Sequence, residues 1–257
     1  MEASLSIHHT CRSLITLNNH QQSSRHRHRQ RPSHRLPFVL AVLSQEPPRL
    51  IEPSTSGSKS VYHDNWYDRI AINHLSQNFQ TIAGTISKRN GYDGLVEAAG
   101  AVYRKFTPTE QGNVVIQTLE KAFPRPILSL IKLLLPQSQF AREYFALFTT
   151  VFFAWLIGPC EVKESEFEGR QEKNVVHIKK CRFLEGTNCV GMCTNLCKMP
   201  SQVFIKDSLG MPLNMVPNFE DMSCEMIFGE EPPLRIHDPA FTQPCFKLCK
   251  ASESGLD

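Results

Sequence analysis

The sequence predicts an α+β fold, in which an N-terminal helical region is followed by a small cysteine-rich module of β-hairpins around a helix. Three observations support this class. Apolar residues recur at helical spacing from Asn65 to about Gly158. After Pro159, apolar and charged residues alternate, which is typical of half-buried strands. Seven of the nine cysteines then lie between Cys181 and Cys249, so the second half of the chain differs chemically from the first.

The first 45 residues are rich in Ser, Arg, His and Gln, with six arginines against a single acid, Glu2. They lack the continuous apolar core of a secretory signal, so residues 1–45 are predicted to be an organelle transit peptide, for a plastid or a mitochondrion. A disordered basic tail is the alternative. Residues 46–63 are rich in Pro and Ser and are predicted to be a linker.

The helical region is predicted over residues 64–158. Trp66, Ile70, Leu75 and Phe79 indicate one amphipathic face, residues 91–106 a second helix, and Pro108 with Thr107 before it the start of a third that reaches Phe123. Prolines 124, 126 and 136 divide shorter pieces. Residues 144–158 form a stretch of fifteen residues without a charge, which is shorter than the roughly 20 needed to span a bilayer. We expect a buried helix here; an apolar pocket wall or a membrane-docking helix is the alternative.

The cysteine-rich module is predicted over residues 159–250, with a disordered tail at 251–257. Its first hairpin turns at Glu168 and Gly169, and its second strand is expected from about residue 174 to 183. A loop at 185–188 precedes a helix that carries three cysteines, is capped by Thr187 or Asn188, and breaks or kinks at Pro200. Residues 211–219 and 222–229 are predicted to form two further short strands.

The charge pattern argues against a nucleic-acid partner. Outside residues 1–45, the chain holds 22 of its 28 basic residues and 24 of its 25 acidic residues, so the part expected to fold is close to neutral. A phosphate-binding protein needs a basic surface on its folded part. We therefore expect no nucleic-acid binding.

Cys189, Cys193 and Cys197 recur at a spacing of four, which places them on one face of a helix. In a straight helix the first and last Cα atoms are about 12 Å apart, whereas one zinc ion holds its sulfurs within about 4–5 Å. Either the segment before Cys193 is not helical, or the thiolates surround something larger, such as an iron–sulfur cluster. Cys245 and Cys249 repeat the spacing and are predicted to complete the site, and Cys181 or Cys224 are alternatives. Buried apolar thiols and disulfides are the other interpretations.

The motif KKCRFLEGTNCVGMCTNLCKMPSQVFIKDSLGMPLNMVPNFEDMSCEMIFGEEPP, with DPAFTQPCFKLCK and ALFTTVFFAWLIGP, resembles the plastid β-carotene isomerases of strigolactone biosynthesis, the iron-containing Dwarf family of plants. The resemblance covers about residues 64–250. It implies conversion of all-trans-β-carotene to 9-cis-β-carotene, an iron requirement, a plastid location, and a carotenoid cleavage dioxygenase that takes up the product. No catalytic residue is carried over. We infer that iron is held by five cysteines: Cys189, Cys193, Cys197, Cys245 and Cys249.

The chemistry of such a reaction requires that one double bond of the polyene temporarily lose its π character. An electron transfer at a thiolate-bound iron, reversible addition of a cysteine, or protonation by Glu185, Glu225 or His237 would achieve this. The main alternative function is a non-catalytic iron–sulfur or zinc module that binds a partner or carries electrons.

Substrate access follows from the chemistry of a C40 hydrocarbon, which has no polar group to bind. We expect a long apolar tunnel and peripheral contact with a plastid membrane. Aromatic residues are dense before the module and are candidates to line the tunnel: Phe140, Phe145, Phe148, Phe152, Phe153 and Trp155.

Overall fold

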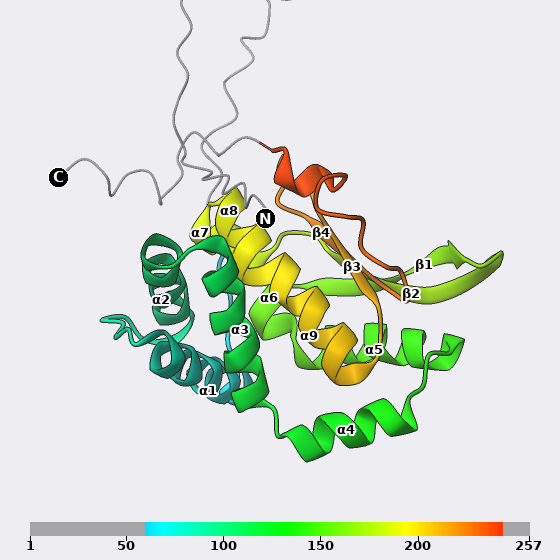
Figure 1. The fold of residues 1–257 in the computed structure, drawn as a ribbon, viewed down its shortest axis with the longest axis horizontal. Helices are drawn as coiled ribbons and strands as arrows, with labels where there is room; N and C mark the ends of the chain where they lie inside the picture. Colours follow the sequence, from blue (N-terminus) through cyan, green and yellow to red (C-terminus); the bar gives the residue numbers. More distant parts are fainter. Residues whose placement is uncertain (1–59, 244–257) are drawn as a thin grey trace, which may run out of the picture. The chain divides into compact units, whose positions relative to one another are not determined.

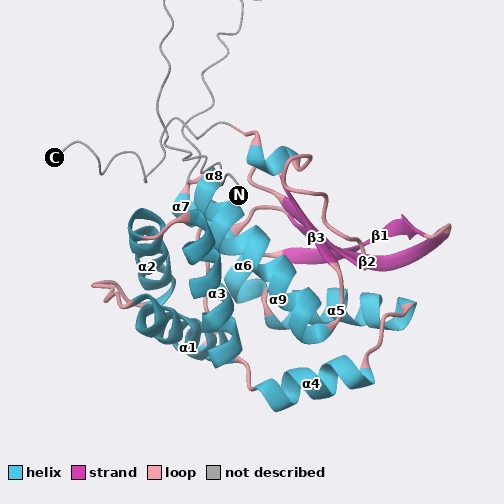
Figure 2. Cartoon of the chain, viewed as in Figure 1, coloured by secondary structure: helices cyan, strands magenta, loops and turns pink. Residues whose placement is uncertain are grey.

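The computed structural model describes residues 60–243. The chain divides into two units, Met1–Ser60 and Val61–Asp257, and only the second is described below. The predicted transit peptide, almost all of the linker, the tail, and the candidate ligands Cys245 and Cys249 lie outside the described residues. The described part is α+β, as predicted, with a helical first half and one antiparallel sheet (Figures 1 and 2).

Three helices form the N-terminal part: α1 (Trp66–Ala83), α2 (Gly91–Lys105) and α3 (Pro108–Ala122). The predicted start of α3 is confirmed, because Thr107 and Glu110 form a reciprocal capping box and Pro108 occupies the first turn. The predicted face of α1 is partly wrong. Ile72, Phe79 and Ala83 are buried, whereas Trp66 and Ile70 are exposed.

The apolar stretch at 144–158 is not a single buried helix. It is divided between α5 (Gln139–Phe152) and α6 (Ala154–Ile157), which follow α4 (Arg125–Leu134). Phe145 and Ala146 of α5 face the core, but Leu147 and Val151 face solvent. A helix that packs on one side of a sheet buries only one stripe, which explains the difference. No helix among residues 60–243 is long and apolar enough to cross a membrane.

The sheet contains β1 (Cys160–Phe167), β2 (Arg170–Ile178), β3 (Leu213–Pro217) and β4 (Cys224–Phe228) in the order β1-β2-β4-β3, all antiparallel. The predicted turn at Glu168 and Gly169 is confirmed, and both residues have positive φ as a two-residue hairpin turn requires. The second strand begins and ends earlier than predicted. The strand ends at Ile178. Beyond it the chain leaves the sheet, and the Cys181 N–H donates to the Met222 carbonyl at 2.7 Å.

Helix α5 packs across β2 and β4 (Figure 1). Arg142 of α5 makes a bidentate ion pair with Glu172 of β2, with N–O distances of 2.6 and 2.7 Å. Its guanidinium group also lies 4.2 Å from the centroid of the Phe167 ring. This contact joins the helical half of the chain to the sheet.

The cysteine-bearing segment is more helical than predicted. Residues 185–187, expected in a loop, belong to α7 (Arg182–Thr187), which ends at Asn188 in the left-handed conformation. Cys189, rather than Thr187 or Asn188, is the N-cap residue of α8 (Val190–Met192). A π-helix, η1 (Cys193–Lys198), and α9 (Met199–Leu209) follow without a break at Pro200. A short 3₁₀ helix, η2 (Pro239–Phe241), ends the described part.

The core is one cluster that crosses both halves. Ile72, Leu95 and Val102 enter it from the first two helices, and Val176 and Phe228 enter it from the sheet. The cysteine-bearing helices contribute Leu184, Met192 and Leu196. The thiols therefore lie within the packed interior, not on a surface loop.

Candidate functional site

Four thiols gather where the sheet meets the cysteine-bearing helices: Cys181, Cys193, Cys197 and Cys224. Cys181 is the N-cap residue of α7, and Cys224 is the first residue of β4. Cys193 and Cys197 lie four residues apart in η1. A charge on any of the other three raises the pKa of Cys193, so the four thiols lie within electrostatic reach of one another. We call these four residues the thiol cluster.

The thiol cluster is held in the neutral form. Burial raises the pKa of Cys193 and of Cys224 well above that of a free thiol, and neighbouring cysteines raise both further. Burial likewise raises the pKa of Cys197 to about 12. Desolvation penalises the charged form of each group, so these side chains are thiols at neutral pH.

The other cysteines are placed differently. Cys189 is buried at the start of α8, and its carbonyl accepts a hydrogen bond from the Cys193 N–H at 3.1 Å. Cys160 begins β1 opposite Ile178, and burial raises its pKa to about 11. Cys245 and Cys249 lie outside the described residues.

The described residues do not complete a metal site by themselves. Within residues 60–243, no group of three or more His, Cys, Asp or Glu side chains lies close enough to hold one metal ion. A metal held by the thiol cluster therefore needs ligands from outside this range or movement of the side chains.

The π-helix explains how three cysteines and a proline share one helical segment. Its wide turn is marked by the Met199 N–H, which bonds to the Thr194 carbonyl five residues back. Gly191, in the preceding turn, lets Tyr103 of α2 lie directly on the helix, since a Cβ there would overlap the phenol. Single π-helical turns are frequent at functional sites.

A buried lysine lies beside the thiol cluster, and sequence analysis did not identify it. Lys198, at the end of η1, pairs with Asp238 at 2.8 Å and also donates to the Met215 carbonyl. Both side chains of the ion pair are almost fully buried. The only signal in the sequence is the position of Lys198 directly after Cys197, which alone predicts an exposed lysine. The pair ties the 3₁₀ helix η2 to the cysteine-bearing segment.

A second buried cation adjoins Cys181. Arg182 pairs with Asp64 at 2.6 Å and donates to the Trp155 carbonyl at 2.8 Å. Its guanidinium group lies 3.9 Å from the centroid of the Tyr92 ring. This arrangement fastens the residues before α1 to the helix that carries Cys181.

The predicted acid candidates are placed as follows. Glu185 accepts a hydrogen bond from the Tyr62 hydroxyl at 2.9 Å and pairs with Lys180 at 2.7 Å. Glu225 lies 3.3 Å from the His177 ring nitrogen. His237 is exposed. The structure does not bring these three groups together.

The six aromatic residues predicted to line a tunnel differ in burial, and Phe148 and Phe153 are partly buried. Phe145 and Trp155 are buried in the core, whereas Phe140 and Phe152 are exposed. The ring centroid of Phe148 lies 4.5 Å from that of Phe152. The exposed members therefore form a surface, which is described below.

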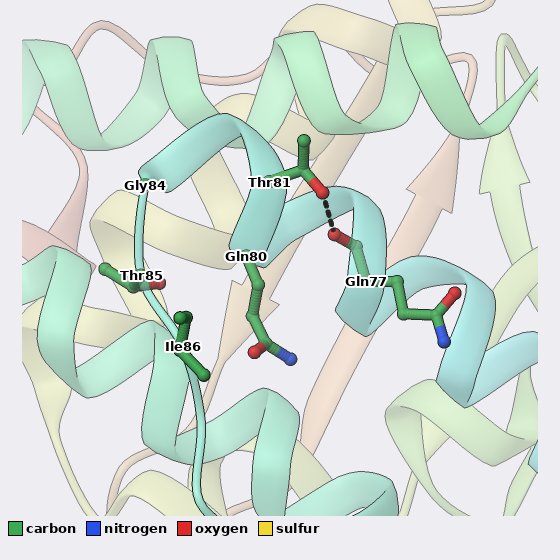
Figure 3. A pocket seen from close by; sticks show the side chains of 6 residues that line it. All are labelled: Gln77, Gln80, Thr81, Gly84, Thr85 and Ile86. Atoms are coloured by element: carbon green, nitrogen blue, oxygen red, sulfur yellow. Dashed lines mark hydrogen bonds between the residues drawn. The ribbon is translucent and has the colours of Figure 1, made fainter.

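Figure 3 shows a pocket at the end of α1. Polar side chains of Gln77, Gln80 and Thr81 line it, together with Ile86. The Thr81 hydroxyl donates to the Gln77 carbonyl at 2.7 Å. None of the cysteines within residues 60–243 lines this pocket.

Comparison with known proteins gives the family. The family model "Beta-carotene isomerase D27-like, C-terminal" matches residues 155–237, which include the thiol cluster. The chain is 59% identical to "Beta-carotene isomerase D27, chloroplastic" of Medicago truncatula over 88% of both proteins. It is 53% identical to the Arabidopsis thaliana protein of the same name, over 79% of this chain and 78% of the relative. No solved structure matches. The chain belongs to the β-carotene isomerase D27 family.

Proposed function

We infer that this chain is a plastid β-carotene isomerase that converts all-trans-β-carotene to 9-cis-β-carotene. The observation that carries the proposal is the 59% identity, over 88% of the chain, to a relative named as a chloroplastic β-carotene isomerase. The basic, acid-poor residues 1–45 support a plastid address. The product would supply a carotenoid cleavage dioxygenase.

The geometry favours thiol or redox chemistry over protonation of the polyene. Glu185 pairs with Lys180 at 2.7 Å and Glu225 lies 3.3 Å from a His177 ring nitrogen, so both carboxyl groups already have polar partners away from a polyene. The thiol cluster, in contrast, offers neutral, buried sulfur atoms in apolar surroundings. Its residues would exclude water from the polyene.

Iron binding is part of the proposal. Its ligands would be Cys189, Cys193 and Cys197 together with Cys245 and Cys249, because the described residues alone do not complete a metal site. Thiolate-bound iron, when present, supplies a one-electron centre whose potential follows burial and hydrogen bonding.

The isomerase activity is tested with purified full-length protein and all-trans-β-carotene in detergent. We expect the mixture to move toward the 9-cis isomer, as measured by chromatography, and to reach the same ratio when the reaction starts from 9-cis-β-carotene. An unchanged isomer ratio with iron-loaded protein would contradict the proposal.

The ligand assignment is tested with Cys193→Ser, and Cys160→Ser serves as the matched control. Cys160 is a half-buried thiol outside the thiol cluster. We expect the Cys193 variant to lose iron, measured by metal analysis and visible absorbance, and the Cys160 variant to retain it. Full iron retention in Cys193→Ser would refute the assignment.

Peripheral contact with a plastid membrane completes the proposal, because β-carotene is a hydrocarbon that dissolves in lipid and not in water. The enzyme would reach such a substrate by docking on the bilayer surface.

A further inference from the structure

The outer face of α4 is apolar although nothing in the described structure covers it. Ile127, Leu130, Leu133 and Leu134 are each more than half exposed, and Leu133 is 77% exposed. The adjoining face of the same helix is also apolar, with Leu128 buried and Ile131 packed against the core. Arg125, Ser129 and Lys132 form the polar side of this amphipathic helix, and its apolar side is wider than the part that the protein covers.

Helix α5, which follows α4 after a short turn, also exposes apolar side chains. Phe140, Leu147 and Val151 are each more than half exposed. We call the exposed residues of α4 and α5 the docking surface. Figure 1 shows α4 at the edge of the helical part, where it packs against α9. A monomeric soluble protein seldom exposes a contiguous apolar patch larger than a few hundred Å².

A series of aromatic rings connects the docking surface with the start of α1. Along α5, the ring centroids of Phe140 and Tyr144 are 6.2 Å apart. From Phe152 the series continues to Tyr67, at 6.4 Å, and from Tyr67 to Trp66, at 6.3 Å. Trp66 is 75% exposed. Exposed Trp and Tyr are typical of membrane–water interfaces, because their rings are apolar and their edges are polar.

Charges around the docking surface fit an anionic partner. Helix α4 contains Arg125 and Lys132 and no acid. The only acid between residues 124 and 157 is Glu143, which accepts a hydrogen bond from the Lys173 N–H of β2 at 3.2 Å. Arg142 is neutralised by its buried pair with Glu172. Arg125 pairs with Glu120 of α3 at 3.2 Å, and the Lys132 Nζ donates to the Asp207 carbonyl at 2.9 Å. The surface therefore combines exposed apolar side chains with one cation, Lys132, that pairs with no carboxylate of residues 60–243.

We propose that the docking surface, together with the start of α1, binds the surface of a lipid bilayer, with α4 lying in the plane of the membrane. The choice of lipid over a second copy of the chain rests on the charge pattern, on the Trp and Tyr residues, and on the proposed function, whose substrate dissolves in lipid. Apolar area inserted into the bilayer supplies most of the affinity, and the cation adds attraction to anionic headgroups.

The test uses the full-length protein and a triple variant, Leu130→Gln, Leu133→Gln and Leu134→Gln. Glutamine keeps a high helix propensity, so α4 should remain folded. The matched control replaces three equally exposed residues outside α4 and α5 with glutamine: Ile86, Leu234 and Ile236. Binding is measured by flotation with vesicles of phosphatidylcholine alone and mixed with phosphatidylglycerol. Circular dichroism confirms that each variant is folded.

We expect the triple variant to bind at least about 100-fold more weakly than wild type, because three leucine side chains no longer transfer from water into the bilayer. The control should change binding by no more than about twofold. Equal binding by the triple variant and wild type, or an equal loss in the control, would overturn the proposal. So would a wild-type dimer in sedimentation that the triple substitution converts to a monomer.

The proposed isomerase function and the proposed lipid-binding surface can be refuted independently of each other. Isomerisation of β-carotene in detergent does not require vesicle binding, so the triple variant should retain that activity. Wild-type protein that binds vesicles through α4 but does not isomerise β-carotene would overturn only the proposed function. Protein that isomerises β-carotene but does not bind vesicles would overturn only the docking surface.

Discussion

The ion pair between Arg142 and Glu172 should contribute strongly to the stability of the fold. Glu172 is only 2% exposed and Arg142 is 12% exposed, and two short hydrogen bonds join them. In Glu172→Gln the guanidinium charge remains buried without its counter-ion, which costs about 3–5 kcal/mol. For a chain of this size the melting temperature should fall by about 6–20 °C.

The assay is urea denaturation followed by circular dichroism, with Glu164→Gln as the control. Glu164 pairs with Lys173 at 4.0 Å on the same sheet, but both side chains are more than half exposed. Its loss should therefore change the free energy of unfolding by less than about 1 kcal/mol. The double variant Arg142→Met, Glu172→Leu should recover most of the stability, because it removes both charges. Equal effects of Glu172→Gln and Glu164→Gln would refute the reasoning.

The same pair gives a pH dependence with a defined sign. The hydrogen bonds from Arg142 lower the pKa of Glu172 below its ordinary value of 4.5. The folded state therefore binds this proton less tightly than the unfolded state. The stabilisation is complete above pH 4.5 and is lost as pH falls through the lowered pKa. The stability difference between wild type and Glu172→Gln should be constant near neutral pH and should narrow in acid. A difference that widens in acid would contradict this.

Two further predictions concern the segment around the thiol cluster. Lys198→Met leaves Asp238 buried without its partner and should lower the free energy of unfolding by about 3–5 kcal/mol, measured by chemical denaturation. Lys206→Met breaks an exposed pair on the same segment and should lower it by less than about 1 kcal/mol. Equal losses in the two variants would argue against a structural role for the buried pair. Gly191→Ala should destabilise the protein by about 1–3 kcal/mol, because the new methyl group overlaps a tyrosine of α2. Gly112→Ala, where the added Cβ meets no atom within 4 Å, should stabilise it by about 0.5–1 kcal/mol. Thermal unfolding that ranks the two alanine variants in the opposite order would show that Gly191 is not needed for this contact.

Local signals predicted the parts of the fold that local chemistry determines. Thr107, Pro108 and Glu110 specify the start of α3 through caps that involve only neighbouring residues. Glu168 and Gly169 specify the hairpin turn in the same way. In each case the signal and the structure lie within a few residues, so tertiary contacts cannot override it.

Other features depend on contacts between distant residues and could not be predicted in this way. The two hairpins join into one sheet through the pairing of β2 with β4, in which Ile178 lies opposite Cys224. This register places Cys224 beside Cys181, although no local pattern relates them. The exposure of Trp66 and Ile70 was missed for a similar reason, since periodicity marks an apolar face but not whether another part of the protein covers it.

The geometry of the cysteine-bearing helix follows from the presence of Pro200 in a segment that is otherwise helical. The sequence alone does not show how the chain accommodates this proline. A regular α-helix through Pro200 would lose the hydrogen bond to the Leu196 carbonyl and bring the proline ring against it. A break at the proline would avoid this, and so would a wider turn. The protein has the wider turn: the Met199 N–H bonds five residues back, to Thr194, and the helix continues. This turn contains Cys197 and Lys198. The wide turn that accommodates the proline therefore also sets the positions of a thiol of the cluster and of a buried lysine. A spacing rule based on 3.6 residues per turn identifies the cysteines, but it cannot give the orientation of side chains within a π-helix.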